Sequence, residues 1–186
     1  DQKQNLEIAR DCARWFNQTY APDEKPIFPV PEPYILDDVA VVPGIDGQKM
    51  SKSYGNTIGI FDEGKTLKKK VMSIVTDSTP LDEPKDPESC NVFALIKLFT
   101  DEDKQNEIAE NYRTGGYGYG HAKKELLQLI TEGFADARAR RKELEARPDY
   151  VRDVLQSGAA RARETVEPVM ARVREATGLL DTRTRV

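Results

Sequence analysis

The chain has 186 residues, of which 38% are hydrophobic and 32% are charged, and its formal net charge at pH 7 is −4. This balance favours folded domains of modest size over a disordered chain. The negative net charge excludes a general nucleic-acid coat, so any nucleic-acid contact must come from a local basic patch. No apolar run approaches the roughly 18 residues of a membrane span, so the sequence predicts no membrane segment.

The two cysteines, Cys12 and Cys90, lie far apart and form no CxxC pair. A disulfide framework is therefore not expected, which fits a reducing, cytoplasmic location. Cys12 falls within an apolar helical pattern, and we expect it to be buried. The chain has one histidine, His121, beside a glycine run, and we expect no metal site.

The first third of the chain predicts one helix and one strand. Apolar residues recur at helical spacing over residues 3–20, and Pro22 ends this pattern. Residues 21–33 contain five prolines and are expected to form an extended connection. VAVV at residues 39–42 is typical of a short buried strand.

Helices dominate the rest. Apolar periodicity and capping residues predict further helices over residues 63–75, 91–99, 101–113, 121–146 and 149–177. The fold class is therefore mainly α. Residues 1–60 contain too few elements to bury both faces of a strand, and they are interpreted as the remnant of a larger α/β domain. Residues 61–178 predict a helical, bundle-like unit, followed by a tail over residues 179–186.

The segment GQKMSKS, residues 47–53, follows the predicted strand and a PGID turn. Lysine and serine are common in surface loops, so an ordinary solvated loop is the simplest alternative. However, the pentapeptide KMSKS is expected by chance in a chain of this length with a probability of only about 1 in 10,000. Two ammonium groups and two hydroxyls on a short loop indicate a binding partner rich in phosphate.

KMSKS is a signature of class I aminoacyl-tRNA synthetases, and the rest of the chain resembles the C-terminal half of the tryptophanyl-tRNA synthetase family. Three further segments carry this resemblance: DQKQNLEIARDCARWFN, KTLKKKVMSIVTDS and GYGYGHAKKELLQLI. Only KMSKS is highly specific by itself. The distinction from the tyrosyl-tRNA synthetases rests on the three longer segments together.

The resemblance implies that residues 1–60 end a Rossmann-type catalytic domain and that the loop binds ATP. Lys52 is then the strongest catalytic candidate, with Lys49 assisting, because a mobile ammonium can meet charge that grows on the pyrophosphate oxygens. Ser51 and Ser53 would bind phosphate or order the loop, and Met50 would anchor it on an apolar surface. ATP is expected as a substrate, with Mg²⁺ carried by its phosphates.

Other positions are assigned by the same resemblance. Asp1 would accept hydrogen bonds from the nucleotide, and Gln2 would bind the amino-acid substrate, although both are also ordinary polar residues at a helix start. Ala40 and Val41 would lie beside adenine, although core burial explains their apolar character equally well. Gly47 would give the loop hinge freedom.

The resemblance also implies that residues 61–178 bind the tRNA anticodon. Residues 136–174 contain ten arginines and lysines. Acidic residues are interleaved with them, so a solvated helix surface is the alternative interpretation. The arginines singled out as candidates are Arg138, Arg140, Arg141, Arg147, Arg152, Arg161 and Arg163.

The chain departs from the family in one respect. Class I synthetases also use a HIGH signature with two histidines, whereas this sequence has one histidine, followed by AKKE. The start DQKQ, without methionine, is interpreted as a cut edge. We therefore expect a fragment of a tryptophan–tRNA ligase that is inactive alone, whose complete form is a homodimer using tryptophan, ATP and tRNA(Trp). A non-catalytic tRNA-binding module and a tyrosyl-tRNA synthetase fragment are the alternatives.

Overall fold

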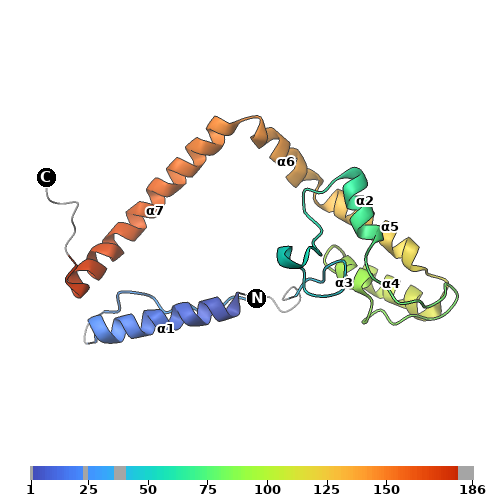
Figure 1. Cartoon of the computed structure of the whole chain (residues 1–186), viewed down its shortest axis with the longest axis horizontal. Helices are drawn as coiled ribbons and strands as arrows, with labels where there is room; N and C mark the ends of the chain where they lie inside the picture. Colours follow the sequence, from blue (N-terminus) through green and yellow to red (C-terminus); the bar gives the residue numbers. More distant parts are fainter. Residues whose placement is uncertain (1, 23–24, 36–40, 180–186) are drawn as a thin grey trace. The chain divides into compact units, whose positions relative to one another are not determined.

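The computed structural model describes residues 2–22, 25–35 and 41–179, and it is mostly helical in this part of the chain. Seven α-helices and one short 3-10 turn are present there, in the order shown by the colours of Figure 1. The chain divides into two compact units, one formed by residues 1–36 with 146–186 and the other by residues 37–145. Each unit is described separately below.

The first unit contains helix α1, Lys3–Tyr20, and helix α7, Pro148–Thr177. Asn17 ties the proline-rich connection to α1. Its Oδ1 accepts hydrogen bonds from the backbone N–H groups of Ile27 and Phe28, both at 3.0 Å, and its Nδ2 donates to the Phe28 carbonyl at 2.8 Å. These bonds replace the backbone pairing that prolines cannot provide.

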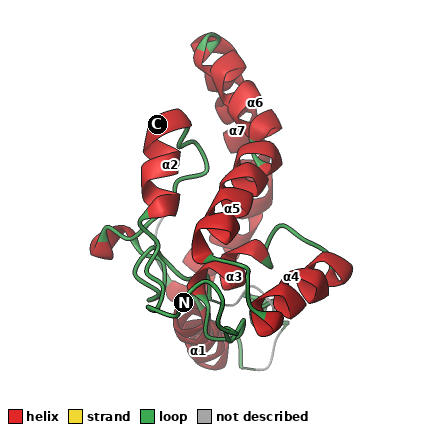
Figure 2. Cartoon of the chain, turned by 90° about the vertical axis from the view of Figure 1, so that its right-hand side faces the viewer, coloured by secondary structure: helices red, strands yellow, loops and turns green. Residues whose placement is uncertain are grey.

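The second unit contains α2, α3, α4, α5 and α6, whose bounds are Gly64–Met72, Asn91–Ile96, Glu102–Thr114, Tyr119–Gly133 and Ala135–Glu145. Helix α5 packs on both α2 and α3, and α3 also contacts α4 (Figure 2). Its core is formed by the largest fully buried side chains of the unit: Tyr112, Phe93, Leu67, Ile74, Ile96, Ile108, Leu126, Val71 and Val92.

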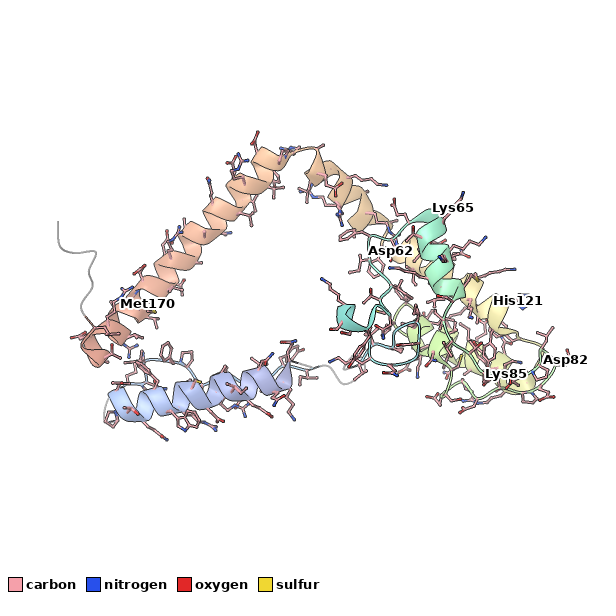
Figure 3. The ribbon with its side chains drawn as sticks, in the orientation of Figure 1. Asp62, Lys65, Asp82, Lys85, His121 and Met170 are labelled. Atoms are coloured by element: carbon pink, nitrogen blue, oxygen red, sulfur yellow. The ribbon has the colours of Figure 1, made fainter. Side chains whose placement is uncertain are left out.

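The buried lysine Lys85 organises the long connection between α2 and α3. Its Nζ donates hydrogen bonds to the carbonyls of Pro80, Leu81 and Glu83 at 2.7, 3.1 and 2.9 Å. Figure 3 labels Lys85 beside Asp82 in this loop. A single ammonium therefore satisfies three carbonyls of a segment that has no regular secondary structure.

The predicted helix over residues 121–146 was wrong as a single element, because the structure divides it into α5 and α6 at Phe134. The Phe134 ring packs edge-on against Phe99, with ring centroids 5.6 Å apart. At Gly133, an added Cβ would lie 3.2 Å from the Phe99 ring. This close packing of an aromatic pair competes with helix continuation, and local periodicity gives no sign of it.

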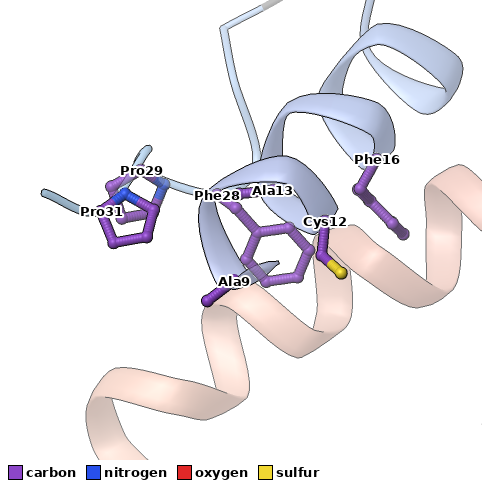
Figure 4. A pocket seen from close by; sticks show the side chains of 7 residues that line it. All are labelled: Ala9, Cys12, Ala13, Phe16, Phe28, Pro29 and Pro31. Atoms are coloured by element: carbon purple, nitrogen blue, oxygen red, sulfur yellow. The ribbon is translucent and has the colours of Figure 1, made fainter. Parts of the chain in front are cut away.

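Two further predicted helices are confirmed, whereas the predicted burial of Cys12 is wrong. The helix over residues 3–20 is confirmed as α1, and the last predicted helix is confirmed as α7, which continues through Pro168. Cys12 is exposed instead of buried, because it lines an open apolar groove of about 450 Å³ in the first unit (Figure 4). The other residues that line this groove are Ala9, Ala13, Phe16, Phe28, Pro29 and Pro31.

The predicted strand at 39–42 lies partly outside the described residues, since only residues 41 and 42 are described. The described residues contain no strand, and one isolated antiparallel bridge joins Pro43 to Lys49. No helix among the described residues is long and apolar enough to cross a bilayer. The assignment of residues 1–60 and 61–178 to a catalytic and a tRNA-binding domain remains a prediction.

Candidate active site

The signature loop begins as a very short hairpin. The bridge between Pro43 and Lys49 is extended by the backbone N–H of Met50, which donates to the Val42 carbonyl at 2.8 Å. Inside it, the Gly44 N–H donates to the Gln48 carbonyl at 2.6 Å. Val42 also packs against the core of the second unit. The base of the loop is therefore anchored in the fold, whereas the residues beyond Met50 leave this hairpin.

Asn56 is the residue that shapes the loop. It is only 2% exposed, and its Oδ1 accepts a hydrogen bond from the Ser51 N–H at 2.7 Å. Its Nδ2 donates to Asp46 Oδ1 at 2.8 Å and to the Lys49 carbonyl at 3.1 Å. One buried side chain thus joins the beginning, the middle and the end of the loop.

Ser51 starts the 3-10 turn η2, Lys52–Tyr54. Its Oγ accepts a hydrogen bond from the Ser53 N–H at 3.3 Å and lies 3.1 Å from the Ser53 hydroxyl. Gly55 closes the turn with a φ of 67°, in the left-handed region that favours glycine. Ser51 therefore caps the turn on which Lys52 sits, and Ser53 supplies the N–H that the cap satisfies.

Lys49 and Lys52 are both exposed, as is Val41, and Met50 is half-buried. The backbone of Lys49 lies in the hairpin and that of Lys52 in the first position of η2. The structure therefore presents two long cationic side chains from a backbone that is fixed by Asn56. Such an arrangement suits an anion of several negative charges, because each lysine carries a compact positive charge on a long side chain.

Gly47 links the loop to α3. Its φ is 81°, and an added Cβ would lie 2.5 Å from Asn91 Nδ2, so no larger residue fits without displacing Asn91. Asn91 itself donates to the Val75 carbonyl at 3.0 Å, and the Val75 N–H donates to the Ile45 carbonyl at 2.7 Å. The turn before the signature is therefore held between α3 and the residues that follow α2.

A family model described as tRNA synthetases class I (W and Y) matches residues 1–135. The chain belongs to this family. It is 53% identical to the tryptophan–tRNA ligase of Fusobacterium nucleatum, and the match covers 97% of this chain and 54% of that relative. The tryptophan–tRNA ligase of Campylobacter jejuni is 47% identical over 96% of this chain and 55% of its own length.

A crystal structure of the Campylobacter jejuni tryptophanyl-tRNA synthetase, complexed with ADP and tryptophane, matches with a TM-score of 0.77 and 47% identity. The match covers 96% of this chain and 55% of that one. The resemblance inferred from KMSKS and the three longer segments is thus confirmed. The chain spans about half the length of the curated relatives it matches.

The synthetase residues predicted upstream of the loop are only partly described. Asp1 and Ala40 lie outside the described residues. Gln2 is exposed at the start of α1, where its Oε1 accepts a hydrogen bond from Asn5 Nδ2 at 2.9 Å. Gln2 and the signature loop belong to different units, so its role toward the amino acid remains a prediction.

The seven candidate arginines of the helical region fall into separate groups. Arg138 is 6% exposed and donates to the carbonyls of Thr131 and Ile130 at 2.9 and 3.3 Å, so it caps the end of α5 and is not available to RNA. Three others form ion pairs along their own helix: Arg140 with Glu143, Arg141 with Glu145, and Arg152 with Asp149. Arg147 stacks on Tyr150.

This leaves Arg161 and Arg163 on α7 as exposed candidates that form no ion pair within the described residues.

From the sequence, the structural role of Asn56 was missed and Arg138 was assigned to the wrong role. Only the position of Asn56 directly after Gly55 hinted at a capping role. In the described residues, no group of three or more histidine, cysteine, aspartate or glutamate side chains is placed to hold a metal ion.

Proposed function

We propose that this chain is the part of a tryptophan–tRNA ligase that supplies the ATP-phosphate loop and a helical tRNA-binding region. The observation that supports this most strongly is the KMSKS turn, with Lys52 presented from a backbone fixed by Asn56, in a chain 53% identical to a tryptophan–tRNA ligase. The tryptophan ligase names of these relatives favour tryptophan over tyrosine as the substrate.

The reaction begins when a carboxylate oxygen of tryptophan attacks the α-phosphorus of ATP. A new P–O bond forms, the bond to the bridging oxygen breaks, and pyrophosphate leaves with the electron pair. Negative charge grows on the bridging and pyrophosphate oxygens in the transition state. The Lys52 ammonium, assisted by Lys49, lowers the barrier if it contacts those oxygens more closely then than in the ground state.

The second step transfers tryptophan to tRNA(Trp). A ribose hydroxyl at the 3′ end attacks the carbonyl carbon of the adenylate, its proton is lost, and AMP leaves.

We propose that Mg²⁺ enters as a complex with the ATP phosphates. Exposed arginines such as Arg161 and Arg163 would position the tRNA backbone. A cytoplasmic location and a homodimer of the complete enzyme belong to the same proposal.

The test is tryptophan-dependent exchange of pyrophosphate into ATP. The 186-residue chain by itself should show no exchange above background, because its sequence contains no HIGH signature. Addition of the remaining half of the Fusobacterium nucleatum ligase should restore exchange, and the Lys52→Ala chain should restore far less. Failure to restore any exchange, with tRNA binding retained, would favour a non-catalytic tRNA-binding module. Robust exchange by the chain alone would refute the fragment interpretation.

A further inference from the structure

A hollow of about 520 Å³ lies beside the signature loop on the surface of α2. Its lining residues are Ile45, Lys65, Thr66, Lys69, Lys70 and Ser73. Ile45 belongs to the turn that leads into KMSKS, and its carbonyl accepts the hydrogen bond from the Val75 N–H. The hollow therefore adjoins the turn that leads into the proposed ATP-phosphate loop. We refer to it as the α2 hollow.

Three lysines line the α2 hollow, and only Lys70 has an ion pair within the described residues. Asp62 and Glu63, at the start of α2, each bind another lysine: Asp62 binds Lys70 at 2.7 Å, and Glu63 binds Lys142 at 3.1 Å. For Lys65 and Lys69, the described part of the chain records no ion pair and no side-chain hydrogen bond, and both side chains belong to exposed residues. Figure 3 labels Lys65 in the first turn of α2 and Asp62 in the segment that leads into this helix.

The floor of the hollow is preformed. Leu67 and Val71 on the opposite face of α2 are 1% and 0% exposed and hold the helix on the core. Lys123 of α5 donates to the Met72 carbonyl at 3.1 Å, which fixes the last turn of α2. Lys65 and Lys69 are separated by one helical turn, about 6 Å along the axis. Their spacing is therefore set by a rigid element and not by a flexible loop.

We propose that the α2 hollow binds the phosphate backbone of the tRNA strand whose 3′ end enters the active site. Two ammonium groups one turn apart, in a hollow that is also lined by Thr66, match consecutive phosphates of a nucleotide strand. Lysine acts on phosphate as a point charge and needs no fixed orientation. The proposal rests on the proposed function, since the accepting hydroxyl must reach an adenylate formed at the adjoining loop.

The experiment compares two variants that lose the same charge. Lys65→Gln with Lys69→Gln alters the α2 hollow, whereas Lys104→Gln with Arg113→Gln removes two positive charges from α4. Binding of a tRNA(Trp) transcript is measured by fluorescence anisotropy between 50 and 200 mM salt. For the α2 variant, the slope of the logarithm of the binding constant against the logarithm of the salt concentration should become less steep by about two units. This variant should also bind roughly tenfold more weakly at 50 mM salt. The α4 variant should change affinity less than about twofold, and Lys65→Arg with Lys69→Arg should retain binding.

Several results would overturn the inference. These are an unchanged salt slope in the α2 variant, equal losses in both variants, or no tRNA binding by the unaltered chain. A raised KM for ATP in pyrophosphate exchange, with tRNA affinity unchanged, would instead assign the hollow to nucleotide phosphates. Exchange and tRNA charging by the complete enzyme are measured separately. If the unaltered enzyme charges no tryptophan but the α2 slope difference persists, the hollow still binds tRNA phosphates, and it is the proposed function, with the entry of the 3′ end into an active site, that fails.

Discussion

Asn56 accepts a hydrogen bond from the backbone N–H of Ser51 at 2.7 Å, across five residues that include both signature serines and Lys52. This bond fixes the residue that caps η2, because Ser51 Oγ in turn accepts from the Ser53 N–H. Asn56 therefore positions the loop through Ser51 without being part of the signature. It also explains how an exposed, lysine-rich segment keeps a defined backbone.

We expect Asn56→Ala to destabilise the second unit by about 2–3 kcal/mol, because three hydrogen bonds at a buried site lose their partner. Urea unfolding measures this loss. Hydrogen exchange at the Ser51 amide should become much faster than at amides elsewhere in the unit. A loss of global stability alone would not affect this amide more than the others. Asn106→Ala, at an exposed position on α4, is the matched control and should cost less than about 0.5 kcal/mol. A Ser51 amide that stays protected in Asn56→Ala would contradict the positioning role.

In the complete enzyme, Lys52→Ala should slow adenylate formation by about 100- to 1,000-fold with little change in tryptophan affinity. Under the proposed mechanism, the Lys52 ammonium meets charge that develops only in the transition state. Single-turnover kinetics separate the two quantities. Lys124→Ala, an exposed lysine of α5, should leave the rate unchanged. Equal losses in rate and in tryptophan binding would argue for a ground-state role of Lys52.

Arg138→Met should destabilise the second unit by about 1–3 kcal/mol, since the carbonyls of Ile130 and Thr131 lose their donor at the break between α5 and α6. Arg140→Met is the comparison, because Arg140 is exposed and forms an ion pair with the exposed Glu143 of its own helix. That variant should cost at most about 0.5 kcal/mol. Thermal unfolding of both variants in the same buffer tests the difference, and similar costs would argue against a capping role for Arg138.

The pH dependence of stability should report on Asp62. Burial by itself raises the pKa of Asp62, but the hydrogen bonds from Lys70 and the Gly59 N–H outweigh it and hold the pKa below the ordinary value of 3.8. A carboxyl whose pKa is depressed by folding stabilises the fold above its ordinary pKa, and this contribution is lost as the pH falls through the folded-state value. Asp62→Asn should therefore be less stable at pH 7 by about 1 kcal/mol, and this deficit should shrink as the pH falls below the ordinary pKa of Asp62.

Urea midpoints of the unaltered chain and Asp62→Asn, measured from pH 7 to pH 2.5, check this prediction. The same substitution at the exposed Asp153 of α7 corrects for the general change in net charge. A deficit of Asp62→Asn that stays constant over this range would show that the ion pair with Lys70 does not carry the effect.

The signature and the first and last helices could be predicted from the sequence, because they depend on local information. KMSKS is contiguous, and α1 and α7 follow from apolar spacing and from the residues that end each helix. The family assignment also rests on contiguous segments, so the comparison with known synthetases confirmed it without help from the fold.

Tertiary structure alone decided the features that depend on contacts between distant residues. The break at Phe134 results from its packing on Phe99, which lies 35 positions earlier in the chain. Arg138 was assigned to a solvated or RNA-binding surface because charge is normally exposed, yet the break creates free carbonyls that its guanidinium satisfies. Likewise, Lys65 and Lys69 are candidates for phosphate binding only because the nearby Asp62 and Glu63 form their ion pairs with other lysines. A sequence lists charges and hydrogen-bonding groups, but only the folded chain determines which of them remain uncompensated.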